Sequence, residues 1–332
     1  MTRFVVCGET LIDLVRTKDP AQGSFSTTWH ALSAGGPMNS AVALGKLGAD
    51  SHFLGRISTD AFGHQLRSHI ADAGVELDLA TESSQATSIA VVSLNAEGVA
   101  SYTFHFSDTA NFGWQADDLP TLDDDDWLHV ASLATVVSPG AEVLLDWART
   151  TKARISFDVN VRPTVITDPA RYWERVKPWL RVVGTHRGIV KASDEDLEFL
   201  MKAGAPSDDV TDIAERWVTD YGLGMAVLTL GPGGGLAIEP GGRRTAVDGF
   251  PTDVVDTVGA GDTFMAGFLD GYVNRGQSVR AALTRGAAAA SIVCSRQGAQ
   301  PPTTAETEAL MGTRDDGELD PDHAKVGWKV PS

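Results

Sequence analysis

Cysteine is nearly absent from this sequence of 332 residues: it occurs only as Cys7 and Cys294, at opposite ends of the chain. Two cysteines so placed do not form a disulfide framework, and neither has the close neighbours of a cysteine metal site. The eight histidines show no HxxxH or HExxH spacing. The sequence therefore predicts no transition-metal site built from protein ligands, and it indicates a cytoplasmic protein.

Basic residues and long apolar runs are also scarce. Lys and Arg number 27 against 44 Asp and Glu, which gives a formal net charge of −17. This charge repels nucleic-acid phosphates and anionic lipid headgroups, so we expect neither as a partner. No uninterrupted run of about 18 apolar residues occurs, and Glu9 and Asp13 interrupt the first apolar stretch too early for a signal peptide. We therefore expect neither a membrane span nor export.

What the chain does contain is a regular alternation of short apolar runs and longer segments with helical periodicity. Strands are predicted from FVVCGETLIDLV, SHFLGRIS, WLHVASL, ARISFDVN, RGIVKAS and MAVLTLG, and helices from NSAVALGKLG, AFGHQLRSHIADAG, TFMAGFLDGYVNRG and the Ala-rich SVRAALTRGAAAASIVCSRQG. This order predicts an α/β protein whose central sheet has helices on its faces. The tail over residues 312–332 is polar and predicted to be irregular.

One region departs from this alternation. Between Ala86 and Trp114, apolar residues recur at every second position on both sides of Asn95-Ala96-Glu97-Gly98. This pattern predicts a β-hairpin, and two consecutive strands without an intervening helix do not fit a parallel sheet. The hairpin is therefore either an edge of the main sheet or a lid over a site.

The stretch DTVGAGDTF, residues 256–264, places an acid directly after Gly-Ala-Gly and before a helix. The free amides of a helix's first turn attract anions, and glycines allow an anion to approach the backbone. Asp262 in that turn makes chemical sense as a base that accepts a hydroxyl proton while the amides stabilise a phosphoryl group in transfer. A tight turn followed by an ordinary first-turn acid explains the motif equally well.

A second candidate site is SAGGPMNS, in which Gly35 and Gly36 lead into a helix that carries Asn39 in its first turn. The Asn amide offers a donor and an acceptor to a hydroxyl. Asp13 is expected at the end of the first strand, where ligands bind in open α/β sheets. Together Asp13 and Asn39 suit a polyol, although a strand-end acid and a helix cap explain each residue alone.

Two further stretches allow more than one interpretation. The glycine-rich TLGPGGG, residues 229–235, is followed by no helix, so it is a phosphate-facing turn or a plain hairpin turn. In DVNVRP, residues 158–163, Arg162 either neutralises a phosphate or carboxylate or pairs with Asp158. The chain contains no GxxxxGK[ST], so a P-loop kinase is unsupported.

These motifs together resemble the PfkB, or ribokinase-like, family of carbohydrate kinases. The likeness runs from GETLIDL through GGPMNSAVALGKLGADSHFLGRISTDAFG to DTVGAGDTFMAGFL and RQGAQPP. It implies a ribokinase-like fold, that is, a mostly parallel sheet flanked by helices with a small β-sheet lid. We expect one kinase domain over residues 1–311, with the lid hairpin inserted at about 87–113, and then the polar tail.

The resemblance also implies roles for individual residues. Asp262 matches the catalytic base, and the amides of its anion hole are matched by Gly259, Ala260 and Gly261. Sugar contacts are matched by Asp13, Gly35, Gly36 and Asn39. The turn along the nucleotide is matched by Thr229, Gly231 and Gly234. The 87–113 hairpin matches the lid, which in such enzymes often also forms a dimer contact.

The resemblance further implies ATP as phosphoryl donor, with Mg²⁺ held chiefly by phosphates and water. Similar kinases use K⁺ bound by backbone carbonyls, and Asp256 and Val258 occupy the matching positions with the loop around Arg296 and Gly298. The chain departs from the family's NxxE motif, because Ser193 to Asp196 reads SDED. Asp in place of Glu shortens the side chain by one methylene, which puts its role in metal binding in doubt.

The start GETLIDL, the strand end DVNVRP and the segment KASDEDLEFL look most like fructokinases. This implies phosphorylation of D-fructose to fructose 6-phosphate, with 2-keto-3-deoxygluconate as second and ribose or a nucleoside as third acceptor. An acidic sugar should favour cations near the lid, but SYTFHFSDTANF has neither Lys nor Arg. A different class is a catalytically silent relative that binds sugar or nucleotide, against which the intact Asp262 and glycine run argue.

Overall fold

The computed structural model describes residues 2–16, 25–94, 100–204 and 207–313. A central sheet of eight strands has the order β14-β13-β12-β11-β10-β9-β1-β4. Its parallel strands are β1 (Arg3–Cys7), β4 (Asp50–Leu54), β9 (Trp127–Ala131), β10 (Arg154–Asp158), β11 (Ile189–Ser193) and β12 (Met225–Thr229). At one side of the sheet, β13 (Gly235–Glu239) pairs antiparallel with β12, and the edge strand β14 (Arg243–Val247) pairs antiparallel with β13. The predicted α/β class is thus confirmed.

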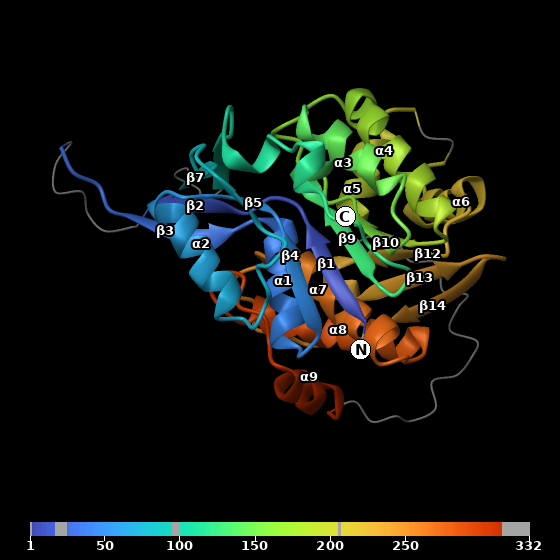
Figure 1. Ribbon diagram of the computed structural model, residues 1–332. Helices are drawn as coiled ribbons and strands as arrows, with labels where there is room; N and C mark the ends of the chain where they lie inside the picture. Colours follow the sequence, from blue (N-terminus) through green and yellow to red (C-terminus); the bar gives the residue numbers. More distant parts are fainter. Residues whose placement is uncertain (1, 17–24, 95–99, 205–206, 314–332) are drawn as a thin grey trace.

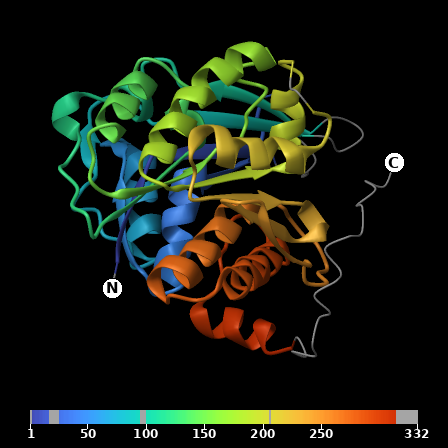
Figure 2. The same cartoon turned by 90° about the vertical axis from the view of Figure 1, so that its right-hand side faces the viewer.

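Helices cover both faces of this sheet (Figures 1 and 2). One layer consists of α3 (Gly140–Ala148), α4 (Pro169–Thr185), α5 (Asp194–Met201) and α6 (Val210–Tyr221), and the other of α1 (Gly36–Lys46), α7 (Ala260–Leu269) and α8 (Val279–Cys294). Each layer has its own cluster of buried apolar side chains against the sheet. Burial on both faces explains why the central strands are nearly continuous apolar runs.

A separate sheet of four strands lies beside the central one, at the left of Figure 1. Its order is β3 (Trp29–Ala34), β2 (Leu11–Arg16), β7 (Ile89–Leu94) and β8 (Ala100–His105). The strands β7 and β8 form the predicted antiparallel hairpin, whose turn at 95–99 lies outside the described residues. Nearby are α2 (Ala61–Ala71) and the pair β5 (Arg56–Ser58) and β6 (Thr81–Ser83). The predicted ribokinase-like arrangement of a large and a small sheet is confirmed.

The sequence-based expectation for the first apolar run was wrong in one respect. FVVCGETLIDLV is not one strand: β1 belongs to the central sheet and β2 to the small one. The chain changes direction at Gly8, which has φ 155°, and a Cβ there would clash with the Pro37 ring. Asp13 consequently lies within β2 and not at the end of the first strand. SHFLGRIS is likewise divided, between β4 and β5.

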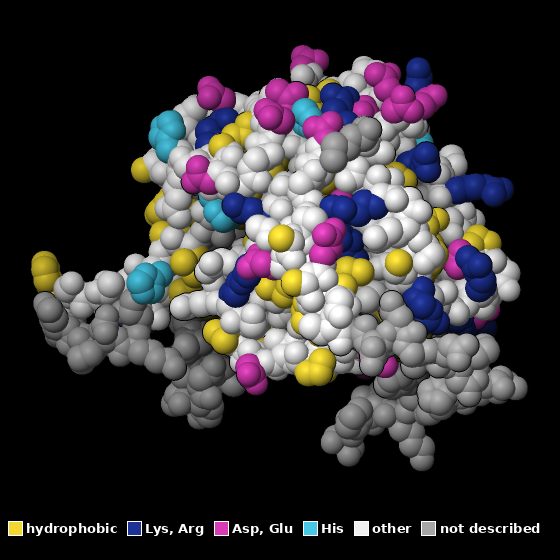
Figure 3. All heavy atoms as spheres, turned by 90° about the horizontal axis from the view of Figure 1, so that it is seen from below, with side chains coloured by type: hydrophobic (Ala, Val, Ile, Leu, Met, Phe, Trp, Pro, Cys, Tyr) yellow, Lys and Arg dark blue, Asp and Glu magenta, His cyan; other side chains and the backbone are white. Residues whose placement is uncertain are grey.

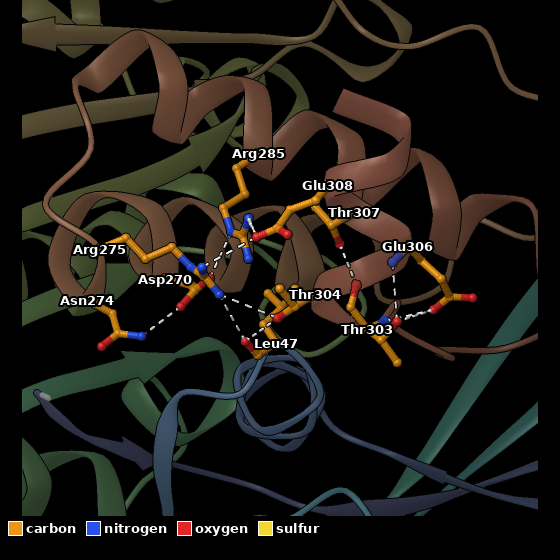
Figure 4. Close-up of polar contacts among 10 residues, drawn as sticks. All are labelled: Leu47, Asp270, Asn274, Arg275, Arg285, Thr303, Thr304, Glu306, Thr307 and Glu308. Carbon is orange, nitrogen blue, oxygen red and sulfur yellow. Dashed lines mark hydrogen bonds and ion pairs between the residues drawn. The ribbon is translucent and has the colours of Figure 1, made fainter. Parts of the chain in front are cut away.

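The C-terminal part is held by an ionic network whose central residues, Asp270 and Arg285, are buried (Figure 4). After α7 the chain makes a π-helical turn, Asp270–Asn274, whose Asp270 carboxylate accepts hydrogen bonds from Arg275 and Arg285. Helix α9 (Thr304–Met311) joins this network through Glu308. The residues 314–332 of the predicted tail lie outside the described residues.

The remaining elements are short 3₁₀ turns, at Ala110–Phe112, Ala116–Asp118, Ser132–Thr135 and Gly231–Gly233. Among the described residues, no helix has the length and apolar character needed to cross a membrane. On the face seen in Figure 3, Lys and Arg side chains of the described residues are scattered among acidic ones and form no basic patch. This distribution agrees with the acidic composition.

Candidate active site

Asp262 lies in the first turn of α7, and its side chain is buried. Its Oδ2 accepts a hydrogen bond of 2.9 Å from Asn39 Nδ2, and its Oδ1 accepts one of 3.2 Å from Asn160 Nδ2. Burial raises the pKa of Asp262, while the Asn39 hydrogen bond and the nearby Arg162 and Lys191 oppose the rise. The result is a fixed carboxylate with neutral donors on both oxygens, which suits a proton acceptor.

Helix α7 begins with partly open amides beside this carboxylate. Gly259 is its N-cap residue and has a left-handed conformation, with φ 77°. Within the described residues, the N–H groups of Gly259 and Gly261 have no hydrogen-bond acceptor, whereas that of Ala260 donates to the Thr257 carbonyl at 3.2 Å. Two of the three predicted amides are therefore open to an anion, and the amide of Ala260 is engaged in the turn.

The first turn of α1 places the second predicted motif at the same point. Pro37 is the second residue of this helix, and Asn39 follows with its side chain toward Asp262. Gly36 lies close by, because a Cβ on it would be 3.2 Å from Asp262 Oδ1. Gly35 precedes the helix with φ 126°. The structure thus joins the SAGGPMNS and DTVGAGDTF motifs into one site.

The loop after β10 contributes Asn160 and Arg162. Asn160, with φ 41°, donates to Asp262 and accepts from Arg162 Nη1 at 2.5 Å. The sequence offered Asp158 as a structural partner of Arg162, and that pairing was wrong: Asp158 pairs with Lys191 across β10 and β11. The reason is register, since Asp158 and Lys191 lie directly opposite each other, whereas Arg162 lies beyond the end of the strand.

The charge of Arg162 influences two more carboxyl groups. Glu9 is buried, accepts a hydrogen bond of 2.9 Å from the Ala134 amide, and has a pKa raised to about 7 by burial. Burial also raises the pKa of Asp13 to about 6. In both cases the charge of Arg162 opposes the rise. The charge of Arg162 therefore acts on the carboxyl groups of Glu9, Asp13 and Asp262.

Sequence reasoning missed three of these residues as parts of the site: Glu9, Asn160 and Lys191. Glu9 is an acid that directly follows a buried apolar strand, and Lys191 is a cation inside one, so both were visible as polar residues in apolar runs. A buried charge needs a partner or a function, which is the signal that would have found them.

Asp196, the residue in place of the family's Glu, is committed to the backbone. Its Oδ2 accepts from the Ser193 amide at 2.8 Å, as part of a capping box that starts α5. Its Oδ1 accepts from the Val161 amide at 2.7 Å. Asp196 therefore supports the loop of Asn160 and Arg162, and its two oxygens are already engaged.

The predicted nucleotide turn connects β12 to β13. Thr229 ends β12, Gly231 starts a 3₁₀ turn, and Gly234 has φ 90° with the Leu230 amide donating to its carbonyl. Because β13 pairs antiparallel with β12, this is a hairpin turn. It lies at the carboxyl end of β12, the same edge of the sheet as the loops after β1, β10 and β11, where ligands bind in α/β proteins.

The candidate cation loops lie next to each other. Asp256 Oδ1 accepts from the Val258 amide at 3.0 Å and Oδ2 from the Gly298 amide at 2.9 Å, so this side chain joins the two loops. Within the described residues, no donor is bonded to the backbone carbonyl of Asp256 or Val258. These carbonyls fit the type of oxygen donor that was predicted for a monovalent cation.

Comparison with known proteins relates this chain to carbohydrate kinases. The pfkB family carbohydrate kinases match residues 1–306. A fructokinase of Rhizobium leguminosarum bv. trifolii is 34% identical over 271 residues, which cover 80% of this chain and 78% of that protein. The crystal structure of a Vibrio cholerae O395 fructokinase with fructose, ADP and calcium ion bound is similar, with a TM-score of 0.77 and 26% identity over 94% of this chain and 99% of that one. A Xylella fastidiosa fructokinase with bound ATP gives a TM-score of 0.79 at 25% identity, over 94% and 99% of the two chains.

Proposed function

The chain belongs to the pfkB family of carbohydrate kinases, and on that premise we propose that it transfers the γ-phosphoryl group of ATP to D-fructose, giving fructose 6-phosphate and ADP. The names of the relatives support fructose as the acceptor. The nucleotides and the sugar bound in the similar structures support the two substrates. The observation that carries the proposal is the Asp262 carboxylate beside the open amides of Gly259 and Gly261.

The chemistry follows from this pair of features. Asp262 accepts the proton of the attacking sugar hydroxyl, whose oxygen forms the new bond to the γ-phosphorus. The bond from that phosphorus to the β–γ bridging oxygen breaks, and ADP leaves with the electron pair. The amides of Gly259 and Gly261 stabilise the negative charge on the phosphoryl group in transfer. Since the Ala260 amide is engaged in a turn, its part in the anion hole requires that this bond opens.

The remaining predicted residues hold the substrates. We assign sugar contacts to Asp13, Gly35, Gly36, Asn39 and Arg162, and nucleotide contacts to Thr229, Gly231 and Gly234. Asn39 donates directly to Asp262, and Arg162 donates to Asn160, which itself donates to Asp262. Sugar binding and base orientation would therefore share the same hydrogen-bond network.

Cations complete the proposal. Mg²⁺ supplies charge neutralisation to the ATP phosphates, and since the Asp196 oxygens are bonded to backbone amides, we expect phosphates and water to be its main ligands. For K⁺, the backbone carbonyls of Asp256 and Val258 are the candidate donors. Activity that is equal in K⁺ and in tetramethylammonium, a large cation that backbone carbonyls cannot bind, would remove the K⁺ requirement.

The charge around Arg162 favours a neutral sugar over ketodeoxygluconate. An anionic acceptor needs a cation that is not already compensated, and Arg162 faces Glu9, Asp13 and Asp262. The other cation of this site, Lys191, is paired with Asp158. A further carboxylate brought to this site would meet an environment that is neutral to negative, whereas the hydroxyl groups of fructose can donate to the same oxygens.

The test is ADP release in the presence of ATP, Mg²⁺ and one sugar at a time. The panel contains fructose, 2-keto-3-deoxygluconate, ribose and a nucleoside. We expect the highest kcat/KM with fructose. Turnover with ketodeoxygluconate alone would change the acceptor and leave the kinase proposal standing. Sugar or nucleotide binding without ADP release from any acceptor would instead favour a catalytically silent relative.

We further propose one kinase domain over residues 1–311, a homodimer formed through the small sheet, and a cytoplasmic location. Trp29 and Leu32 of the edge strand β3 are partly exposed apolar side chains, which supports a contact there. Sedimentation of the wild type against a Trp29→Ser, Leu32→Ser variant tests the dimer, since only a contact through β3 predicts a monomeric variant.

A further inference from the structure

A buried lysine lies directly under the start of α7. Lys191 is 3% exposed in β11, and its Nζ is 3.1 Å from Oδ2 of the fully buried Asp158, its partner in the register of β10 and β11. A Cβ on Gly261 would lie 2.8 Å from the Lys191 Nζ. The absence of a side chain at position 261 thus lets the ammonium reach the backbone of the helix's first turn.

Stability alone does not account for this arrangement. The start of a helix carries a partial positive charge, so a cation there is unfavourable. Burying an ion pair costs desolvation energy, and apolar side chains of similar size are often as stable. Asp158 Oδ1 has no hydrogen-bond partner within the described residues, so this pair is not even fully satisfied. A cation in this position, beyond its pairing with Asp158, is explained if a second negative charge lies at the start of the helix.

Asp262 provides one such charge, and the migrating phosphoryl group provides the other. We propose that Lys191 is a positioning residue for the reaction: its ammonium, held against Gly261 by Asp158, keeps the Asp262 side chain ionised so that it can accept the hydroxyl proton. The inference rests on the proposed function, because it takes Asp262 as the base. Lys191 itself touches no substrate in this account and acts through Asp262 and the helix.

The charges around Asp262 determine in which direction each of them shifts its pKa. Burial raises the pKa of Asp262, and Arg162 and Lys191 oppose the rise. Although burial pulls the pKa of Lys191 down, the nearby carboxylates raise it, so the ammonium stays charged. Asp158 acts the other way: it repels the charge of Asp262, and burial lifts its own pKa to about 7. Lys191, Arg162 and Asp158 themselves interact electrostatically with further titratable groups. These are Glu9, Asp13, His129, Tyr172 and Asp196.

The test is the pH profile of kcat at saturating fructose and ATP, which reports the ionisation of groups in the bound complex. In Lys191→Met, the acid limb of kcat should move to higher pH, because one cation near the carboxylate is lost. In Asp158→Asn, the limb should move to lower pH, because one anion is lost. Lys191→Arg retains the charge and should restore the limb toward the wild-type position. On the acid side, each pH unit of displacement changes kcat about tenfold.

A second comparison guards against misfolding of Lys191→Met, in which Asp158 has lost its partner. The double variant Lys191→Met, Asp158→Asn removes the pair without leaving a buried charge. Its acid limb should lie at higher pH than that of Asp158→Asn alone, because these two variants differ only at position 191, where the double variant has lost the charge. Urea unfolding of each variant shows that the compared proteins are folded.

The inference is overturned if the limb stays in place in both comparisons while kcat falls, because a purely structural pair changes the rate without changing its pH dependence. Failure of the proposed function looks different. In that case the wild type releases no ADP with fructose, or Asp262→Asn keeps its turnover, whatever the Lys191 variants do. An inactive Asp262→Asn together with an unmoved limb therefore rejects the role of Lys191 alone.

Discussion

Asn39 Nδ2 donates a hydrogen bond of 2.9 Å to Asp262 Oδ2, although the two residues are 223 positions apart in sequence. The bond joins the first turns of α1 and α7, two helices that pack against the same face of the central sheet. With Asn160 on the other oxygen, both donors to this carboxylate are neutral amides. Neutral donors orient a carboxylate and depress its basicity less than a direct ion pair does, so Asp262 keeps its ability to accept a proton.

The first prediction concerns this carboxylate. Asp262→Ala should lower kcat by on the order of 10²–10⁴, because a general base acts mainly in the transition state. Its affinity for fructose, measured by calorimetry without ATP, should remain nearly unchanged. Asp212→Ala is a matched control, since Asp212 is an exposed acid in the first turn of α6. A variant at position 262 that keeps most of its turnover would show that another group is the base.

Much of this site could be predicted from the sequence because its central parts are local motifs. The glycines and Asp262 stand within four consecutive positions, and Gly35, Gly36 and Asn39 within five, at helix starts whose amides and caps follow from residue type. The central sheet could also be predicted from a local pattern, the alternation of apolar runs with helical segments. Each strand buried on both faces of the sheet is a continuous apolar run in the sequence.

What the sequence did not predict depends on strand register and on tertiary packing. Lys191 faces Asp158 because β10 and β11 pair in one particular register, which no local pattern specifies. Glu9 became part of the site through burial against the Ala134 amide, 125 positions away. The division of FVVCGETLIDLV into β1 and β2 depends on contact between Gly8 and Pro37, residues of different elements. Such contacts become visible only in the folded chain.

The second prediction concerns the network of Figure 4. Asp270 is fully buried; its Oδ2 accepts from Arg275 Nε at 2.8 Å and from Arg285 Nε at 2.7 Å, and its Oδ1 from Asn274 at 2.8 Å. Asp270→Ala leaves the buried guanidinium of Arg285 without this carboxylate, so we expect a loss of about 3–5 kcal/mol in the free energy of unfolding.

Urea unfolding measures this loss, and an exposed ion pair provides the control. Arg149→Ala removes the partner of Asp146 on the surface of α3 and should cost less than about 1 kcal/mol. Equal losses for the two variants would mean that burial adds nothing to the Asp270 network.

The third prediction concerns stability at acid pH. His129 is fully buried between Ser156, which bonds to its Nδ1 at 2.9 Å, and the charge of Lys191. Burial lowers its pKa from 6.5 to about 3. Between these values the unfolded chain binds a proton that the folded chain does not, so His129 makes the protein less stable as the pH falls below 6.5.

The slope of unfolding free energy against pH reveals this contribution. His129→Gln should reduce the loss of stability between pH 6.5 and 4, while its stability at pH 8 reports the separate cost of changed packing. A variant whose slope equals that of the wild type would assign the acid sensitivity to other groups, such as carboxylates that are ionised in the folded state.

The last prediction separates two carboxyl groups that face the same guanidinium. Burial raises the pKa of Asp13 to about 6 and that of Glu9 to about 7, each against the opposing charge of Arg162. If the Asp13 carboxylate accepts hydrogen bonds from the sugar, fructose should bind tightly at pH values above 6 and progressively more weakly below pH 6, because a protonated carboxyl group loses acceptor capacity.

Calorimetric titration of fructose without ATP, from pH 5 to pH 8, isolates this binding from catalysis. Asp13→Asn should bind more weakly at pH 8 and should lose the decline near pH 6. Glu9→Gln is the matched control, since it removes the other raised carboxyl group and should keep that decline. A decline that persists in Asp13→Asn and vanishes in Glu9→Gln would mean that Glu9, after the end of β1, contacts the sugar and that Asp13 of the small sheet does not.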